Sequence, residues 1–347
     1  MTSEVVVVSV GARTPVGVSA APAAAAVRAQ ISRLVEHATF EDAAGNSLKC
    51  APDPHLPPTM PAVRRIGAMA RHAILDAIRP LTWARPLGLP VTVLVAFPEV
   101  RPGFAAADVG RIMDDIGEMF TDDADDVQCR GFALGHAGFI QAAQIARAQV
   151  VSDSGLCLIC GADSYLDRYT LDWLDSERRL ARDEIRDGFI PGEAAGVMAI
   201  TTEAVRSARK FPRSGVLRSV ALAQEPRLRT SPEGCLGEGL TRATRQACSA
   251  LGDTLVDDIY SDINGERYRS EEWGFVAMRI PAAFKALAYE APASSWGDVG
   301  AASAALGTVL AVQSWARKYA RGPRALVIGG SRDGTRGAIL LLDPKGA

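Results

Sequence analysis

The chain has 347 residues, 48% hydrophobic and 22% charged, a balance typical of a soluble globular protein with a large core rather than a disordered chain. Lys and Arg number 38 and Asp and Glu 40, so the formal net charge is −2 and leaves no positive excess for nucleic-acid phosphates. We therefore expect no nucleic-acid partner.

The first residues show no targeting signal. Glu4 stands where a signal peptide is basic, and the apolar run 5–8 is too short for a signal-peptide core or a membrane span. We expect a cytoplasmic protein without a membrane segment.

The strand pattern begins at the N-terminus and continues through the chain. Short apolar runs alternate with helical stretches, which predicts an α/β protein. The predicted strands are 4–11, 91–97, 156–163, 195–201, 216–223, 257–265, 325–331 and 337–343. The stretch 210–215 (KFPRSG) interrupts this order, and we place there the junction between an N-terminal half, 1–209, and a C-terminal half, 216–347.

Two predicted helices, 135–149 and 300–315, are rich in Ala and Gly and carry little charge. A helix that is apolar most of the way round must be covered on several sides, and small side chains let neighbouring layers approach closely. One such helix in each half predicts a central layer buried between two sheets.

Six cysteines are scattered along the chain without the spacing of a disulfide framework, and we expect reduced thiols. Cys157 and Cys160 form a CxxC inside the apolar run LCLIC, with no second Cys/His pair at zinc spacing, which favours buried thiols in a strand. The chain has only four histidines. We expect no metal site and no cofactor.

Four segments in the same order resemble the β-ketoacyl synthases of the thiolase superfamily. EVVVVSVGARTPVG at 4–17 is similar to the family's opening strand and loop, and RDGFIPGEAAGVMAI at 186–200 resembles its Arg-Asp-Gly-Phe segment. The stretch 232–253 resembles the one that precedes the family's His-Gly-Thr motif, and 294–307 resembles its Thr-Gly-His…Gly-Ala-Ala motif. The resemblance implies a thiolase fold, five layers αβαβα built from two similar halves, and a homodimer. We expect the dimer to form through the edge of the N-half sheet, with the apolar strand AGVMAI at 195–200.

In that family, a cysteine at the start of the first central helix is acylated, and two histidines assist the condensation. The resemblance places Gly135, Asn264 and Asp298 at these three positions. Asn264 can donate a hydrogen bond but cannot shuttle a proton near neutral pH, and the charge of Asp298 disfavours a thiolate and a malonyl carboxylate. We expect no catalytic residues of the family type and no condensation. Cys129, six residues before Gly135, belongs to the preceding strand, and its use as a rewired nucleophile stays an alternative.

Other roles remain open for the residues of this region. Asp298 precedes an apolar helix and is either its N-cap or part of a rewired site with His136. In the second case Ser294 or Ser295 is the candidate that replaces the cysteine. The segment 329–338 corresponds to the family's last Gly-rich loop. There Arg332, Asp333 and Arg336 either line the pocket mouth, where they suit a polar or protein partner, or form a solvated turn.

The leading hypothesis is a non-catalytic β-ketoacyl synthase-like protein that acts as a binding, chaperone or assembly partner. By family analogy alone, it is accessory to a biosynthetic cluster or a type VI secretion effector. The partner would be a second copy, an effector, an acyl carrier protein or an active synthase. The alternatives are an acyltransferase (3-oxoacyl-ACP synthase-like) or thioester hydrolase with a rewired site of His136 and Asp298, and an inactive subunit paired with an active synthase.

Overall fold

The computed structural model describes residues 4–41, 45–81, 88–120 and 126–345. Its strands form a nine-stranded sheet, in the order β5-β4-β6-β7-β1-β8-β11-β10-β9, and a separate hairpin of β2 and β3. The strands are β1 Val5–Arg13, β2 Val35–Glu41, β3 Ser47–Cys50, β4 Val91–Phe97, β5 Val127–Ala133, β6 Leu156–Ser164, β7 Glu193–Thr202, β8 Gly215–Gln224, β9 Asp258–Ser261, β10 Arg324–Gly330 and β11 Thr335–Leu342.

The helices connect these strands and cover them. They are α1 Ala20–Arg28, α2 Ala62–Ile78, α3 Ala106–Gly117, α4 Gly138–Asp153, α5 Arg168–Ser176, α6 Glu203–Arg209, α7 Glu238–Cys248, α8 Arg267–Arg279, α9 Ala293–Trp296 and α10 Ser303–Ala316. Over the described ranges, none of these helices has the length and apolar character needed to cross a membrane.

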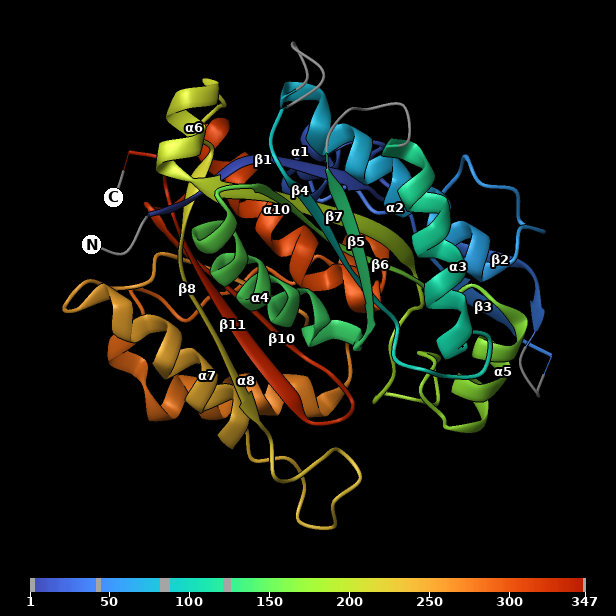
Figure 1. Cartoon of the computed structure of the whole chain (residues 1–347). Coiled ribbons are helices and arrows are strands. Elements are labelled where there is room, and N and C mark those ends of the chain that lie inside the picture. The colour runs from blue at the N-terminus through green and yellow to red at the C-terminus, as the bar shows by residue number, and fades with distance from the viewer. Residues whose placement is uncertain (1–3, 42–44, 82–87, 121–125, 346–347) are drawn as a thin grey trace.

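The large sheet consists of two parts that meet at β1 and β8. These two strands pair at only two positions, and the parts on either side enclose α4 and α10, which contact strands of both (Figure 1). Helices α2 and α3 cover the outer face of the N-half strands, and α7 and α8 lie outside the C-half strands. Separate apolar clusters fill the central layer and the two outer layers. The predicted five-layer αβαβα arrangement is confirmed.

The two halves repeat one strand pattern. In order and direction, β8, β9, β10 and β11 correspond to β1, β4, β6 and β7. Within the described residues the C-half has no strand equivalent to β5; the segment 284–290 runs beside β9 with isolated bridges only. The stretch 210–215 lies between α6 and the start of β8. That 1–209 and 216–347 form distinct domains stays a prediction.

The two central helices differ in how far they are covered. Almost every residue of α10 is buried, as predicted, whereas α4 leaves Gln144, Arg147, Ala148 and Val151 exposed. These positions recur at spacings of three or four residues, so they form one face of the helix. The helix 135–149 is thus covered on several sides, as predicted, and leaves one face open in the single chain.

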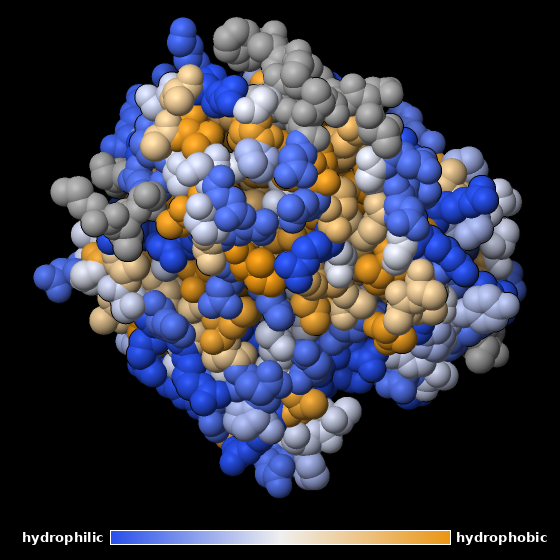
Figure 2. All heavy atoms as spheres, viewed as in Figure 1, coloured by the Kyte–Doolittle hydropathy of each residue, from blue (hydrophilic) through white to orange (hydrophobic). Residues whose placement is uncertain are grey.

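The strand expected at the edge of the N-half lies inside the sheet. The run 195–200 belongs to β7, which pairs with β6 on one side and β1 on the other. A continuous apolar run is typical of a strand covered on both faces, which explains the error. The edge strand is β5, where Gln128 and Arg130 are exposed. Figure 2 shows apolar residues gathered on the face where Figure 1 places α4 and β5.

Candidate functional site

The N-terminal ends of the two central helices meet at one point. A 3-10 turn at Gly135–Ala137 leads into α4, and a second at Gly300–Ala302 leads into α10, and the two turns are in contact. Gly135 has a φ of 64° and Gly300 a φ of 49°, both in the left-handed region that glycine tolerates best. Glycine at these positions thus lets the chain turn sharply into each helix.

Asp298 is the centre of a buried polar cluster at this point. Its Oδ1 accepts hydrogen bonds from Nε2 of His136 at 3.0 Å and from the N–H of Gly300 at 2.7 Å. Its Oδ2 accepts one from Nδ2 of Asn264 at 2.5 Å. Asp298 and His136 are only 3% and 5% exposed. The structure therefore brings together His136, Asn264 and Asp298, residues that the sequence singled out from three distant segments.

The surroundings of Asp298 favour its charged form. Burial alone would raise the pKa of this carboxyl, but His136, Arg269 and the N–H of Gly300 outweigh burial, and the pKa lies well below its ordinary range. The ionised carboxylate keeps a proton on Nε2 of His136, because that nitrogen must donate to it. The other ring nitrogen, Nδ1, has no hydrogen-bond partner in the described part of the chain. Asp298 thus caps the turn at Gly300 and also orients His136.

A ring of charges behind this cluster was not predicted. Glu266 accepts a hydrogen bond from Nδ2 of Asn264 at 3.2 Å, and its own N–H donates to the Asn264 side chain at 2.9 Å. Arg179 pairs with Glu266 at 2.7 Å, and Arg269 pairs with Asp262 at 2.5 Å. Burial would raise the pKa of Glu266, but these two arginines lower it. Two nearly buried ion pairs therefore border the cluster.

The place expected for the nucleophile lies against the Glu99 side chain. A Cβ added to Gly135 would lie 3.0 Å from Cγ of Glu99. The Ser331 hydroxyl donates to the carbonyl of Leu134 at 2.6 Å and accepts from the N–H of Ala137 at 2.8 Å. A backbone donor at the start of α4, which would otherwise be free for an anion, is therefore already used.

No alternative nucleophile contacts His136 within the described residues. Cys129 lies on β5 and packs against the outer N-half cluster, on the opposite side of the sheet from α4, and burial raises its pKa. Ser294 is exposed and Ser295 is buried in α9, and neither hydroxyl hydrogen-bonds to His136. Cys157 and Cys160 are buried in β6 as free thiols.

The three charged residues of the last loop lie in different surroundings. Arg332 and Asp333 are exposed in a turn, where the Asp333 carboxylate accepts from the N–H of Thr335 at 2.7 Å. Arg336 is buried and forms two hydrogen bonds with Glu272, at 2.7 and 2.6 Å. All three line a pocket of about 360 Å³. The solvated turn and the charged pocket lining are thus both present.

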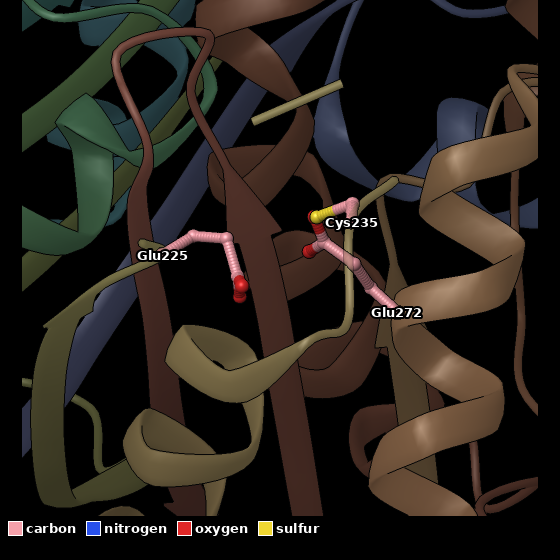
Figure 3. Close-up of side chains that lie close together, drawn as sticks. All are labelled: Glu225, Cys235 and Glu272. Atoms are coloured by element: carbon pink, nitrogen blue, oxygen red, sulfur yellow. The ribbon is translucent and has the colours of Figure 1, made fainter. Parts of the chain in front are cut away.

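A group of three potential metal ligands, Glu225, Cys235 and Glu272, lies beside this pocket. Figure 3 shows Cys235 and Glu272 next to each other and the Glu225 side chain on the other side of the group; their ligand atoms lie within 4.8 Å of one another. The Cys235 thiol donates to Glu272 at 2.7 Å, and burial raises its pKa to about 12. Because Arg336 already holds both carboxylate oxygens of Glu272, an ion pair accounts for this group.

The sequence matches no protein-family model and no curated protein. Solved structures match it closely in shape. The ishigamide ketosynthase/chain length factor has a TM-score of 0.82 at 16% identity, with 99% of this chain and 100% of that chain covered. A type II PKS acyl-carrier protein in complex with its ketosynthase bound to the hexaketide has a TM-score of 0.82 at 14% identity, with the same coverage.

A third similar structure is the ketosynthase in complex with its chain length factor from Xenorhabdus doucetiae. Its TM-score is 0.76 at 14% identity, and 98% of each chain is covered. These matches extend over nearly the whole chain and agree with the order of strands and layers described above. The chain therefore has the thiolase fold in the form seen in ketosynthases and chain length factors.

Proposed function

We propose that this chain is a non-catalytic ketosynthase-like protein that serves as a binding or assembly partner in polyketide or fatty acid biosynthesis. The observation that carries the proposal is the cluster at the two helix N-termini. Gly135 supplies no nucleophile, Asn264 supplies no proton shuttle, and Asp298 places a buried negative charge there. A negative charge opposes the thiolate and repels the malonyl carboxylate that a condensation requires.

The face around α4 and β5 supports the partner role. β5 is an edge strand, and such a strand offers unpaired backbone groups to another chain. The neighbouring face of α4 exposes Ala148 and Val151 and has a half-buried Ile145. We infer that a second copy of this chain or a related synthase subunit covers this face. The solved complexes of a ketosynthase with its chain length factor support that inference.

A thioester hydrolase is the second candidate, because His136 and Asp298 have the arrangement of a base held by a carboxylate. Asp298 fixes Nε2, so Nδ1 is the nitrogen that can accept a proton. A hydrolase built on this pair needs a water molecule beside Nδ1, since no serine or cysteine in the described ranges forms a hydrogen bond with His136.

One experiment separates the two candidates. A panel of acyl thioesters is incubated with the wild type, His136→Ala and Asp298→Asn, and the same three proteins serve as baits in a pull-down from the native cell. The binding proposal predicts no hydrolysis above the protein-free control and a synthase or carrier protein retained by all three. Hydrolysis that both substitutions abolish would refute it in favour of the hydrolase.

A further inference from the structure

One atom in the group of Glu225, Cys235 and Glu272 has no partner among the described residues. The ion pair with Arg336 accounts for the place of Glu272, and the Cys235 thiol donates to the same carboxylate. Glu225 is only 2% exposed, and its Oε2 accepts from the N–H of Gly239 at 2.7 Å. Its Oε1 is buried and forms no hydrogen bond with any residue that the structure describes. A buried carboxylate oxygen without a partner is uncommon and costly, which points to a ligand from outside the chain.

Three separate parts of the C-half bring this group together. Glu225 directly follows β8, Cys235 lies in the loop before α7, and Glu272 belongs to α8. Gly234 and Gly237, on either side of the cysteine, have φ of 73° and 62°, so the loop turns tightly there. Figure 3 shows the Glu225 carboxyl group facing the Cys235 thiol and the Glu272 carboxylate, and the ligand atoms lie within 4.8 Å of one another. A metal ion bound at about 2.0–2.3 Å holds its ligands roughly 3.5 Å apart, so small side-chain movements suffice to take one.

The charges of the group favour a divalent cation. Among the described residues, Arg336 is the only cation that pairs with either glutamate, so two ionised glutamates leave one negative charge uncompensated. Glu225, Cys235, Glu272 and Arg336 are each 3% exposed or less. Burial raises the pKa of Glu225, and the charge of Glu272 adds to this effect. When a divalent ion binds the sulfur of Cys235, the thiol proton leaves to the solvent and the buried charges cancel.

The ion pair of Arg336 and Glu272 is compatible with a metal ligand. Each carboxylate oxygen has two lone pairs, and the guanidinium takes one on each oxygen of Glu272. Carboxylates that bind metal ions are commonly hydrogen-bonded to further residues, which hold them in place. One thiolate and two carboxylates suit zinc, whereas magnesium and calcium prefer oxygen ligands alone. The donor set therefore identifies zinc as the fitting ion.

We propose that Glu225, Cys235 and Glu272 bind a zinc ion that fastens the loop 226–237 to α8. Three side chains leave the fourth position of a tetrahedral site to water. Cys235 also lines a surface pocket of about 720 Å³, which gives the ion and the water a path to the site. The spacing of Cys and His in the sequence could not reveal such a site, because two of its ligands are distant glutamates. The site uses neither the His136 cluster nor the face of α4, so failure of the proposed partner role leaves it intact.

Metal binding by the full chain tests the proposal. The purified protein is freed of metal with a chelator and titrated with Zn²⁺ by isothermal titration calorimetry, and with Co²⁺ as a spectroscopic probe. We expect one ion per chain and, with cobalt, the near-ultraviolet charge-transfer band of a thiolate ligand. Zinc should also raise the midpoint of thermal unfolding, because it binds the folded chain preferentially. Absence of saturable zinc binding, or cobalt bound without the thiolate band, would overturn the proposal.

Two substitutions locate the site. Cys235→Ser keeps a donor of similar size beside Glu272, and Glu225→Gln removes one charge. Each should weaken zinc binding at least about a hundredfold, since loss of a supporting residue alone costs roughly 10- to 100-fold. Cys248→Ser, on α7, and Glu233→Gln, at an exposed glutamate of the same loop, are matched controls that should bind as the wild type does. Circular dichroism verifies the fold, and Cys235→Ser decides alone if Glu225→Gln does not fold. Unchanged zinc affinity in the folded variants would contradict the site.

Discussion

Gly135 illustrates how a single position decides the chemistry of this fold. Its φ of 64° favours glycine, and a Cβ at this position would press against the Glu99 side chain. Putting a cysteine there brings its Cβ to 3.0 Å from Cγ and 3.2 Å from Oε2 of Glu99. A carboxylate so close opposes ionisation of a thiol.

We therefore expect that Gly135→Cys does not restore condensation of acyl and malonyl thioesters. A side chain at a left-handed φ should also cost about 1–2 kcal/mol in the free energy of unfolding, measured by urea denaturation. Gly110→Ala is the control, because a Cβ at this helical position of α3 meets open space. It should gain about 0.5–1 kcal/mol. A Gly135→Cys protein that is as stable as the wild type and forms condensation product would contradict this interpretation.

The lowered pKa of Asp298 predicts how the free energy of unfolding depends on pH. The stability that this carboxylate contributes is fully present above the unfolded-state pKa, about 3.9, and is lost as the pH falls through the lower folded-state pKa. Asp298→Asn should retain the fold but lose about 1–3 kcal/mol of unfolding free energy at pH 7, since an N–H₂ group then faces a donor.

That loss should be smaller when unfolding is measured near pH 3, where the wild type has begun to lose the contribution. Asp172→Asn serves as the matched control. Asp172 is half exposed in a pair with Arg168, so its change should stay within about 0.5 kcal/mol at both values of pH. An equal loss for Asp298→Asn at both values would rule out a buried, ionised Asp298.

Among the elements, α4 and β5 determine the assembly prediction. Light scattering at micromolar concentration should give the wild type twice its chain mass of 36.7 kDa. The double substitution Ala148→Glu and Val151→Glu puts two charges on the exposed face of α4 and should yield monomers, because buried charges without partners are costly at an interface. Tyr169→Glu, at a tyrosine that is 72% exposed on α5, should leave the mass unchanged. A monomeric wild type would remove self-association from the proposal.

The strands of this protein were far more predictable than its exposed elements. The strands β4, β6 and β7 are buried throughout, and their long apolar runs could be recognised as strands from the sequence. The hairpin of β2 and β3 escaped prediction because most of β2 is exposed and its sequence, VEHATFE, has no apolar run. The apolar run of β7 correctly predicted a strand, but we placed that strand at the edge of the sheet. Composition does not reveal which strands are its neighbours.

At the scale of the whole molecule, the resemblance of short motifs was enough to predict the layers and to bring His136, Asn264 and Asp298 to one point. The charged ring around them was not predictable. Arg179 and Glu266 are 87 residues apart and look like ordinary surface charges until the fold buries them together. Such partners depend on topology, and the solved structures share that topology at only 12–16% identity.

The central claim is that this fold is present here without its condensation chemistry, and the most direct test is turnover by the purified wild-type chain. Acyl and malonyl thioesters are supplied on acyl carrier protein, and the 3-oxoacyl product is quantified by mass spectrometry against a protein-free control and an active ketosynthase. Because Asp298 is buried and ionised beside Gly135 and Asn264, we expect product at the level of the protein-free control. Product above that level, formed in proportion to the concentration of the chain, would contradict the claim.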